Sequence, residues 1–239
     1  MEIALLFVAL FGLLVFGVPV AIALAGSSAL YVLVSGSVPP MVVAHRMING
    51  VDSFPLLAVP FFILAGNLMN TAGITERIFN FALSMVGWMR GGLGHVNVGA
   101  SVIFAGMSGA AVADAGGLGA IEIKAMRDAK YDPEFAVGIT AASSTIGPII
   151  PPSLPMVIYG VVASASIGQL FAAGFVPGLV MALSLMVMVA IMARRRGYPR
   201  DQAFVVSVLL SSFRRAFLSL LTPVIIVGGI LTGAFTPTE

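Results

Sequence analysis

Long apolar runs separated by short polar segments make up most of this chain. The first run, residues 3–34, contains no charged side chain. As a single helix rising about 1.5 Å per residue, it would be about 48 Å long, whereas the hydrocarbon core of a bilayer is about 30 Å thick. This run must therefore tilt or break, and we expect the break at Gly17-Val18-Pro19 because proline disrupts a helix interior.

Later apolar runs predict further membrane-spanning helices. Residues 54–72 and 75–89 are expected to form the second and third spans, and residues 169–193 a later one. This later run ends at three consecutive arginines, 194–196, which favour the cytoplasmic side of a membrane. Residues 217–235 predict a further span.

Two polar segments separate these runs. Residues 122–134 carry most of the charge in their region and are predicted to be a solvated loop. Residues 203–216 are amphipathic, with Leu209 and Phe213 on one face and Arg215 near another, so we expect a helix lying in the membrane interface.

Two further segments combine apolar composition with residues that interrupt helices. Residues 91–121 are rich in glycine and predict a re-entrant helical hairpin that turns near Ser108-Gly109. Residues 143–153 contain three prolines, so residues 133–145 and 154–165 are predicted to be two half-helices around an unwound centre. Irregular backbone at membrane depth occurs only where protein or a wet cavity covers it.

Paired interrupted segments indicate a transport site. Unwound carbonyl groups can replace the hydration shell of Na⁺, and free N–H groups at half-helix termini suit an anion. The alternative is that the small residues only let helices pack closely. Neutral side-chain oxygens that could take part are those of Ser108, Ser143, Ser144, Thr145 and Ser153.

Asp114 is an acid within an apolar run. A carboxylate at the bilayer centre costs about 2.5–3.5 kcal/mol on insertion scales, so it needs a function or access to water. It could bind a cation, relay a proton or cap the second helix of the hairpin; the alternative is an ordinary polar residue at a wet hairpin mouth. Asn67 and Asn97 are expected to tie helices together.

The composition strengthens the membrane interpretation. Apolar residues make up 59% of the 239 residues and charged residues only 9%, against about 25% in soluble domains. Lipid must therefore be the solvent. The absence of cysteine excludes disulfides and thiolate metal sites. The small net charge of +2 gives no indication of nucleic-acid binding.

An enzyme is one alternative. Gly106-Met107-Ser108-Gly109 matches the G-x-S-G pattern of rhomboid intramembrane proteases, but that mechanism needs a later histidine as base. The two histidines, His45 and His95, both precede Ser108 and are expected to be interfacial. A passive channel would show a polar pore stripe, and a purely structural membrane subunit would not need two broken helices. We therefore predict a transporter rather than an enzyme.

Several stretches carry a family resemblance. They are Pro60–Gly66, Asn97-Val98, Phe104–Asp114, Ala141–Ser153 and the closing Phe235–Glu239. Together they resemble the large membrane subunit of tripartite ATP-independent periplasmic (TRAP) transporters, the DctM-like family. The Gly-Pro-Ile-Ile-Pro-Pro-Ser run is the more specific of these motifs.

The resemblance implies a fold class and a function. The fold would be an all-α polytopic membrane protein, the first half of an inverted-repeat, elevator-type transporter. The protein would be a large permease subunit in the bacterial inner membrane, importing organic anions of the dicarboxylate or sugar-acid type with Na⁺ as coupling ion and no other cofactor. Its partners would be a small membrane subunit (DctQ-like) and a periplasmic substrate-binding protein (DctP-like).

The resemblance also implies a division of the chain. The expected parts are scaffold-like helices (1–90), a transport-domain part (91–168) with a hairpin at about 95–121 and a broken helix at about 133–165, a span with a cytoplasmic basic end (169–200), an arm (201–216), and a span with the start of a second repeat (217–239). The rest of that repeat would lie beyond Glu239.

The resemblance finally implies site residues. The expected Na⁺ ligands are Ser108, Gly109, Ser144, Thr145, Gly147 and Pro148, and the expected substrate-binding residues are Ser108, Ser143, Ser153 and Asp114. Ala110 stands where the family often has a second serine, which leaves backbone ligands at that point. The alternative function is a related Na⁺/anion symporter without a binding protein, against which the Gly147–Ser153 run argues.

Overall fold

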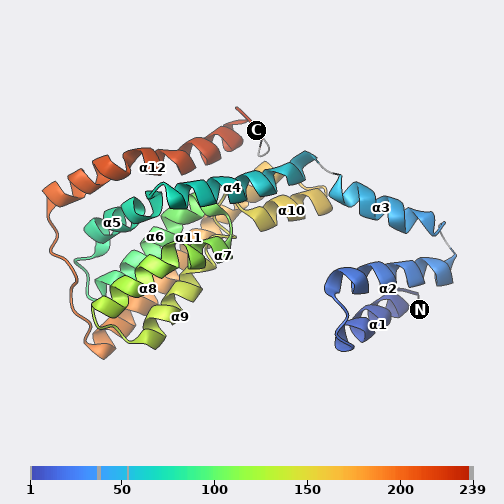
Figure 1. The fold of residues 1–239 in the computed structure, drawn as a ribbon, viewed down its shortest axis with the longest axis horizontal. Helices are drawn as coiled ribbons and strands as arrows, with labels where there is room; N and C mark the ends of the chain where they lie inside the picture. Colours follow the sequence, from blue (N-terminus) through green and yellow to red (C-terminus); the bar gives the residue numbers. More distant parts are fainter. Residues whose placement is uncertain (1, 37–38, 53, 237–239) are drawn as a thin grey trace. The chain divides into compact units, whose positions relative to one another are not determined.

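The computed structural model describes residues 2–36, 39–52 and 54–236, and the regular elements in these ranges are helices (Figure 1). Within them, two helices are long and apolar enough to cross a membrane, Ile167–Arg196 and Val206–Ile230. The all-α membrane fold class predicted from the sequence is confirmed. The chain forms two compact units, Met1–Ser53 and Phe54–Glu239.

The first unit begins with a helical hairpin. Helix α1 (Glu2–Val15) and helix α2 (Val20–Ser35) pack against each other, and α3 (Met41–Val51) follows. The chain reverses at Gly17, whose φ of +78° suits glycine, and Pro19 precedes α2. The predicted break at Gly17-Val18-Pro19 is confirmed.

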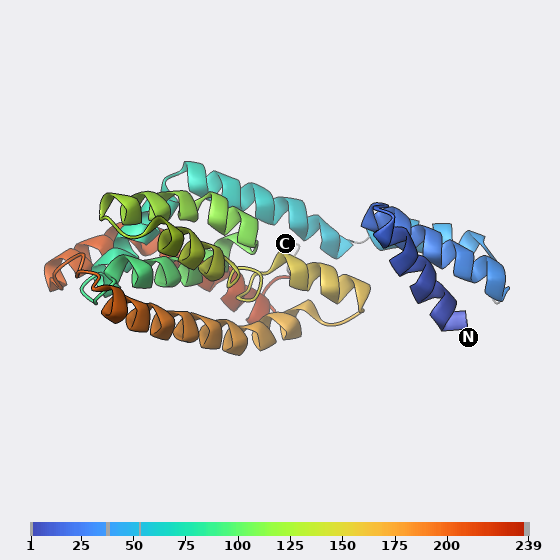
Figure 2. The same ribbon diagram turned by 90° about the horizontal axis from the view of Figure 1, so that it is seen from below.

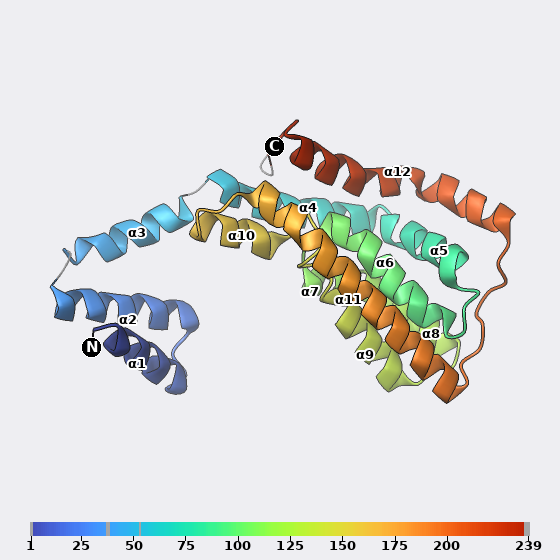
Figure 3. The same cartoon turned by 180° about the vertical axis from the view of Figure 1, so that it is seen from behind.

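The second unit is organised around one buried helix. Its elements are η1 (Phe54–Leu57), α4 (Ala58–Thr71), α5 (Ile74–Val86), α6 (Gly92–Ser108), α7 (Ala111–Gly116), α8 (Leu118–Asp128), α9 (Pro133–Ser144), α10 (Leu154–Val162), α11 (Ile167–Arg196) and α12 (Val206–Thr232). Helix α6 contacts α5, α8, α9, α11 and α12 (Figures 2 and 3). Because nearly all of α6 is buried, its glycines and alanines allow these neighbours to approach closely.

Two predictions about polar segments were wrong. Residues 122–134 are not simply a solvated loop, because α8 continues to Asp128 and Glu122 is only 2% exposed. The expected interfacial helix 203–216 and span 217–235 are one continuous helix, α12, with Pro223 inside it. Residues 54–90, which the sequence analysis grouped with the preceding segment, pack in the second unit.

The connection between α11 and α12 is fastened to the start of α6. The carboxylate of Asp201 accepts hydrogen bonds from the Leu93 backbone N–H (2.9 Å) and the Tyr131 hydroxyl (2.6 Å). The backbone N–H groups of Asp201 and Gln202 both donate to the Gly87 carbonyl. Burial, together with the neighbouring Asp201, raises the pKa of Tyr131, so the hydroxyl remains a donor.

A second polar cluster lies beside this connection. The Asp132 carboxylate accepts hydrogen bonds from Arg196 and the Tyr198 hydroxyl, each at 2.7 Å. The rings of Tyr131 and Tyr198 lie 4.4 Å apart between centroids, so the two clusters are in contact. Together they join the end of α11 to the start of α9.

Candidate functional site

The hairpin predicted in the glycine-rich segment turns where expected. Helix α6 ends at Ser108, Gly109 adopts a left-handed conformation with φ of +62°, and α7 begins at Ala111. A left-handed residue at the end of a helix is most readily glycine, because other residues are strained there. The predicted turn at Ser108-Gly109 is therefore confirmed.

The proline-rich segment separates two half-helices. Helix α9 ends at Ser144 and α10 begins at Leu154, as predicted. Ser153 caps α10: its hydroxyl oxygen accepts from the Met156 backbone N–H (3.2 Å), and its hydroxyl donates to the Pro148 carbonyl (2.6 Å). This capping replaces hydrogen bonds that the interrupted helix has lost.

The hairpin tip and the helix break are in direct contact. The Leu154 backbone N–H donates to the Gly109 carbonyl at 3.1 Å. A Cβ atom added to Gly109 would lie 2.4 Å from the carbonyl oxygen of Pro152, so the close approach requires glycine. A Cβ added to Gly147 would lie 3.5 Å from the carbonyl carbon of Ala110. Two segments that the sequence identified separately thus form one site.

A cavity of about 310 Å³ adjoins the hairpin tip, between α4 and the hairpin. Its polar lining includes Asn67, Asn70 and Ser108. The Ser108 hydroxyl is buried and, within the described ranges, has no hydrogen-bond partner. An unpartnered buried hydroxyl is available to a ligand. Asn67, which was expected to tie helices together, instead lines this cavity.

A buried hydrogen-bond network lies on the other side of the hairpin. The Asn97 amide donates to Glu122 Oε2 and to the Thr140 hydroxyl, both at 2.7 Å, and accepts from the Ser143 hydroxyl at 2.6 Å. The Ser101 hydroxyl donates to the Ser143 oxygen at 3.1 Å. Asn97 therefore ties α6, α8 and α9 together, as the sequence indicated.

Asp114 faces this network rather than the cavity. It is 1% exposed, and neither carboxylate oxygen has a hydrogen-bond partner in the described part of the chain. The side chains of Ser101 and Ser144 lie near its carboxyl group, and Glu122 is close enough to interact with it electrostatically. The sequence analysis missed Glu122. Helical periodicity gave no signal that pairs them, because Asp114 lies on α7 and Glu122 on α8.

The predicted substrate-binding residues separate into two groups. Ser108 lines the cavity, whereas Ser143, Ser153 and Asp114 do not. The hydroxyls of Ser143 and Ser153 are buried and engaged in the internal hydrogen bonds described above. Of the four predicted residues, Ser108 is the one that lines this cavity.

The predicted Na⁺ ligands all lie in the tip or the break. Thr145 is exposed and donates its hydroxyl proton to the Ala142 carbonyl (2.6 Å), and Ser144 donates to the Thr140 carbonyl (2.7 Å). Both hydroxyl oxygens keep lone pairs that can face a cation. In the described ranges, no group of three or more acidic or histidine side chains could hold a metal ion. The oxygens at the predicted ligand positions are neutral hydroxyl and carbonyl oxygens.

The structure argues against a protease at Ser108. His95 is 1% exposed, so its side chain lies inside the protein. It lies on the same helix as Ser108 and thirteen residues earlier, a separation of about 20 Å at about 1.5 Å per residue. Because a general base must lie within hydrogen-bond reach of its nucleophile, His95 cannot activate Ser108.

Comparison with known proteins identifies the family. The model for the family described as "Tripartite ATP-independent periplasmic transporter, DctM component" matches residues 7–239. The chain belongs to this family. The family resemblance found in the sequence is confirmed, and the relatives are transporter permeases rather than enzymes.

Three relatives are similar to this DctM-family chain over most of its length. The sialic acid TRAP transporter large permease protein SiaM of Vibrio cholerae is 56% identical over 95% of this chain and 53% of its own length. The sialic acid TRAP transporter permease protein SiaT of Haemophilus influenzae is 59% identical over 82% of this chain and 32% of its own. The C4-dicarboxylate TRAP transporter large permease protein DctM of Vibrio cholerae is 41% identical over 100% of this chain and 53% of its own. The chain spans about half the length of these large permease relatives.

Proposed function

We propose that this chain forms part of the large permease subunit of a Na⁺-coupled transporter that imports an organic anion by an elevator motion. The observation that carries the proposal is the contact between the hairpin tip at Gly109 and the helix break at Pro152 and Leu154. Interrupted helices that meet inside a membrane protein supply backbone and hydroxyl ligands for a coupling ion and a substrate.

The proposed Na⁺ site uses oxygens of the tip and the break. Its ligands would come from Ser108, Gly109, Ser144, Thr145, Gly147 and Pro148. Neutral oxygens favour Na⁺ over a divalent ion, which commonly uses carboxylates. The positions of Gly109 and Gly147 support this site, because both bring backbone close to the opposite segment.

The proposed substrate is a sugar acid of the sialic acid type. Support comes from identities of 56% and 59% to the sialic acid permeases, compared with 41% to the C4-dicarboxylate permease. The cavity beside Ser108 adds two amide side chains, Asn67 and Asn70, which can donate to a carboxylate or hydroxyl group. A C4-dicarboxylate is the second candidate.

The proposed setting is the bacterial inner membrane, with two protein partners. The family description names a tripartite periplasmic system, which supports a periplasmic substrate-binding protein and a small membrane subunit as partners. A binding protein that delivers substrate would distinguish this system from a related Na⁺/anion symporter. The apolar helices α11 and α12 support the membrane location.

The test is uptake into proteoliposomes containing the full-length permease and its small subunit, with the binding protein added or omitted. Thr145→Ala should raise the Na⁺ concentration for half-maximal uptake about tenfold, the loss expected for one hydroxyl contact to an ion. Thr222→Ala is the matched control, because the Thr222 hydroxyl likewise donates to a carbonyl of its own helix. It should leave the Na⁺ dependence unchanged.

Three results would contradict parts of the proposal. Uptake that does not depend on Na⁺ would reject the coupling ion. Uptake with Na⁺ but without the binding protein would favour the symporter. An equal effect of Thr145→Ala and Thr222→Ala would remove Thr145 from the Na⁺ site.

A further inference from the structure

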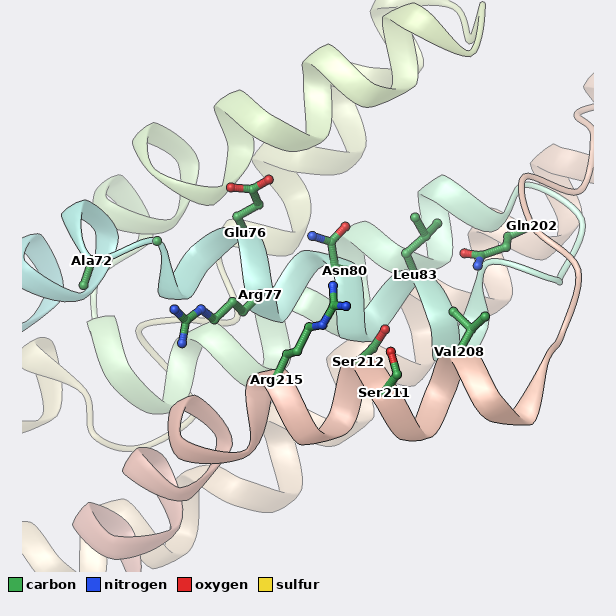
Figure 4. A pocket seen from close by; sticks show the side chains of 11 residues that line it. Ala72, Glu76, Arg77, Asn80, Leu83, Gln202, Val208, Ser211, Ser212 and Arg215 are labelled. Atoms are coloured by element: carbon green, nitrogen blue, oxygen red, sulfur yellow. The ribbon is translucent and has the colours of Figure 1, made fainter.

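A polar groove of about 750 Å³ lies between α5 and α12, away from the hairpin and the helix break (Figure 4). Its polar lining comes from both helices and from the connection before α12: Glu76, Arg77, Asn80, Gln202, Ser211, Ser212 and Arg215. Neither the proposed Na⁺ site nor the cavity beside Ser108 shares these residues. The groove therefore needs an explanation of its own.

The groove carries a net positive charge, because two arginines and one glutamate line it. Arg77 on α5 and Arg215 on α12 form no ion pair with any residue in the described ranges. Figure 4 shows Arg215 extending from α12 toward Asn80, whereas Glu76 points away from α12. Two guanidinium groups, an amide and the Ser211 hydroxyl thus share one groove, a combination that recognises an oxyanion.

Part of the groove lining is apolar. Ala72, Leu83 and Val208 line it, and Val208 is 37% exposed. Helix α12 is also one of the two helices in the described ranges that could cross a membrane. Cationic and hydroxyl groups beside exposed apolar side chains match an amphiphile, which has a charged head and hydrocarbon chains.

We propose that this groove binds the phosphate group of an anionic membrane phospholipid. Arginine binds phosphate oxygens in a bidentate manner, and one headgroup in the groove would contact α5 and α12 together. The lipid would thereby bridge α5 and α12, which also pack directly against each other at Phe81 and Phe213. This inference requires the membrane location but not the proposed coupling ion or substrate.

The experiment is lipid binding to the full-length permease with its small subunit in detergent, followed by native mass spectrometry. Phosphatidylglycerol is the probe, phosphatidylcholine the zwitterionic comparison and inorganic phosphate the soluble competitor. Each of Arg77→Gln and Arg215→Gln should weaken phosphatidylglycerol binding about fivefold, and the double variant about 25-fold, as expected for one cation near a charged lipid.

Arg214→Gln is the matched control, because Arg214 is an exposed neighbour on α12 outside the groove. It should change phosphatidylglycerol binding less than twofold, a bound set below the effect of one cation. Phosphatidylglycerol should also raise the unfolding temperature of the wild-type protein and not that of the double variant. Thermal unfolding without lipid checks that the double variant is folded.

The proposal is overturned if phosphatidylcholine binds as tightly as phosphatidylglycerol, or if Arg214→Gln weakens binding as much as the groove variants. It is also overturned if inorganic phosphate gives the same stabilisation as the lipid, because the ligand would then be a soluble anion. Unchanged lipid binding in the double variant would show that the groove is not the site. These readouts do not involve uptake, so failure here leaves the proposed transport function untouched.

Discussion

Replacing Gly109 by alanine tests whether the hairpin tip must touch the helix break. Gly109 has φ of +62°, and an alanine there would be strained by about 1–2 kcal/mol. Its Cβ would also lie 2.4 Å from the Pro152 carbonyl oxygen, whereas ordinary van der Waals contact begins at 3.4 Å. The tip and the break must therefore separate by about 1 Å (3.4 − 2.4 Å), and overpacking of this kind costs about 1–3 kcal/mol.

The expected total destabilisation is about 2–5 kcal/mol, the sum of the two contributions. Gly197→Ala is the matched control, because Gly197 has φ of +70° and no atom within 4 Å of the added Cβ. It should lose only the backbone contribution of about 1–2 kcal/mol. Unfolding of the full-length protein in detergent by increasing SDS measures both variants on one scale.

The two variants should also differ in transport. A displaced tip removes backbone ligands from the proposed Na⁺ site, so Gly109→Ala should abolish Na⁺-dependent uptake while Gly197→Ala retains it. Equal destabilisation of the two variants would refute the reasoning, because the contact with Pro152 would then contribute nothing. A stable Gly109→Ala protein with normal uptake would refute it as well.

The remaining predictions concern packing and charge. Gly119→Ala should destabilise the protein, because the added Cβ would lie 2.7 Å from the Thr140 Cγ2 methyl. Adding Thr140→Ser should restore stability, because it removes that methyl and keeps the hydroxyl. Unfolding of the two single variants and the double variant measures this coupling. The Tyr198 hydroxyl and the Arg196 guanidinium hold the pKa of Asp132 below its ordinary 3.8. The ionised Asp132 therefore contributes its full stabilisation of the folded protein above pH 3.8. That contribution is lost as the pH falls through the lower pKa of the folded state. Asp132→Asn should therefore lower the unfolding midpoint at neutral pH and match wild type well below pH 3.8; a constant difference across that range would contradict this.

The interruptions of the helices could be predicted from local residues. Gly17-Val18-Pro19, Ser108-Gly109 and the prolines after Ser144 each break a helix for a reason contained in a few neighbouring residues. The contact between the tip and the break could not be derived in this way. It depends on the position of α9 beside α6, which is a tertiary feature.

The error at Glu122 has a similar origin. A segment with seven charged residues in thirteen is ordinarily solvated, and most of this one is exposed. Glu122 is buried because Asn97, twenty-five residues earlier, supplies a hydrogen bond to its carboxylate. The two-helix prediction around residue 216 also failed because an amphipathic pattern and an apolar pattern can follow one another within a single helix, as they do in α12.

The hydrogen bonds of Asp201 and Gln202 to Gly87 limit how far α12 can move. Within the described part of the chain, residues 203–205 are the short stretch between the fixed Gly87 contacts and the start of α12 at Val206. Four steps from Gln202 to Val206 span at most about 14 Å when fully extended, at about 3.5 Å per residue. However α12 is displaced, its first residue stays within that distance of Gln202, and Gln202 stays beside Gly87 as long as the two hydrogen bonds hold. The travel of α12 relative to the end of α5 therefore has an upper bound set by three residues.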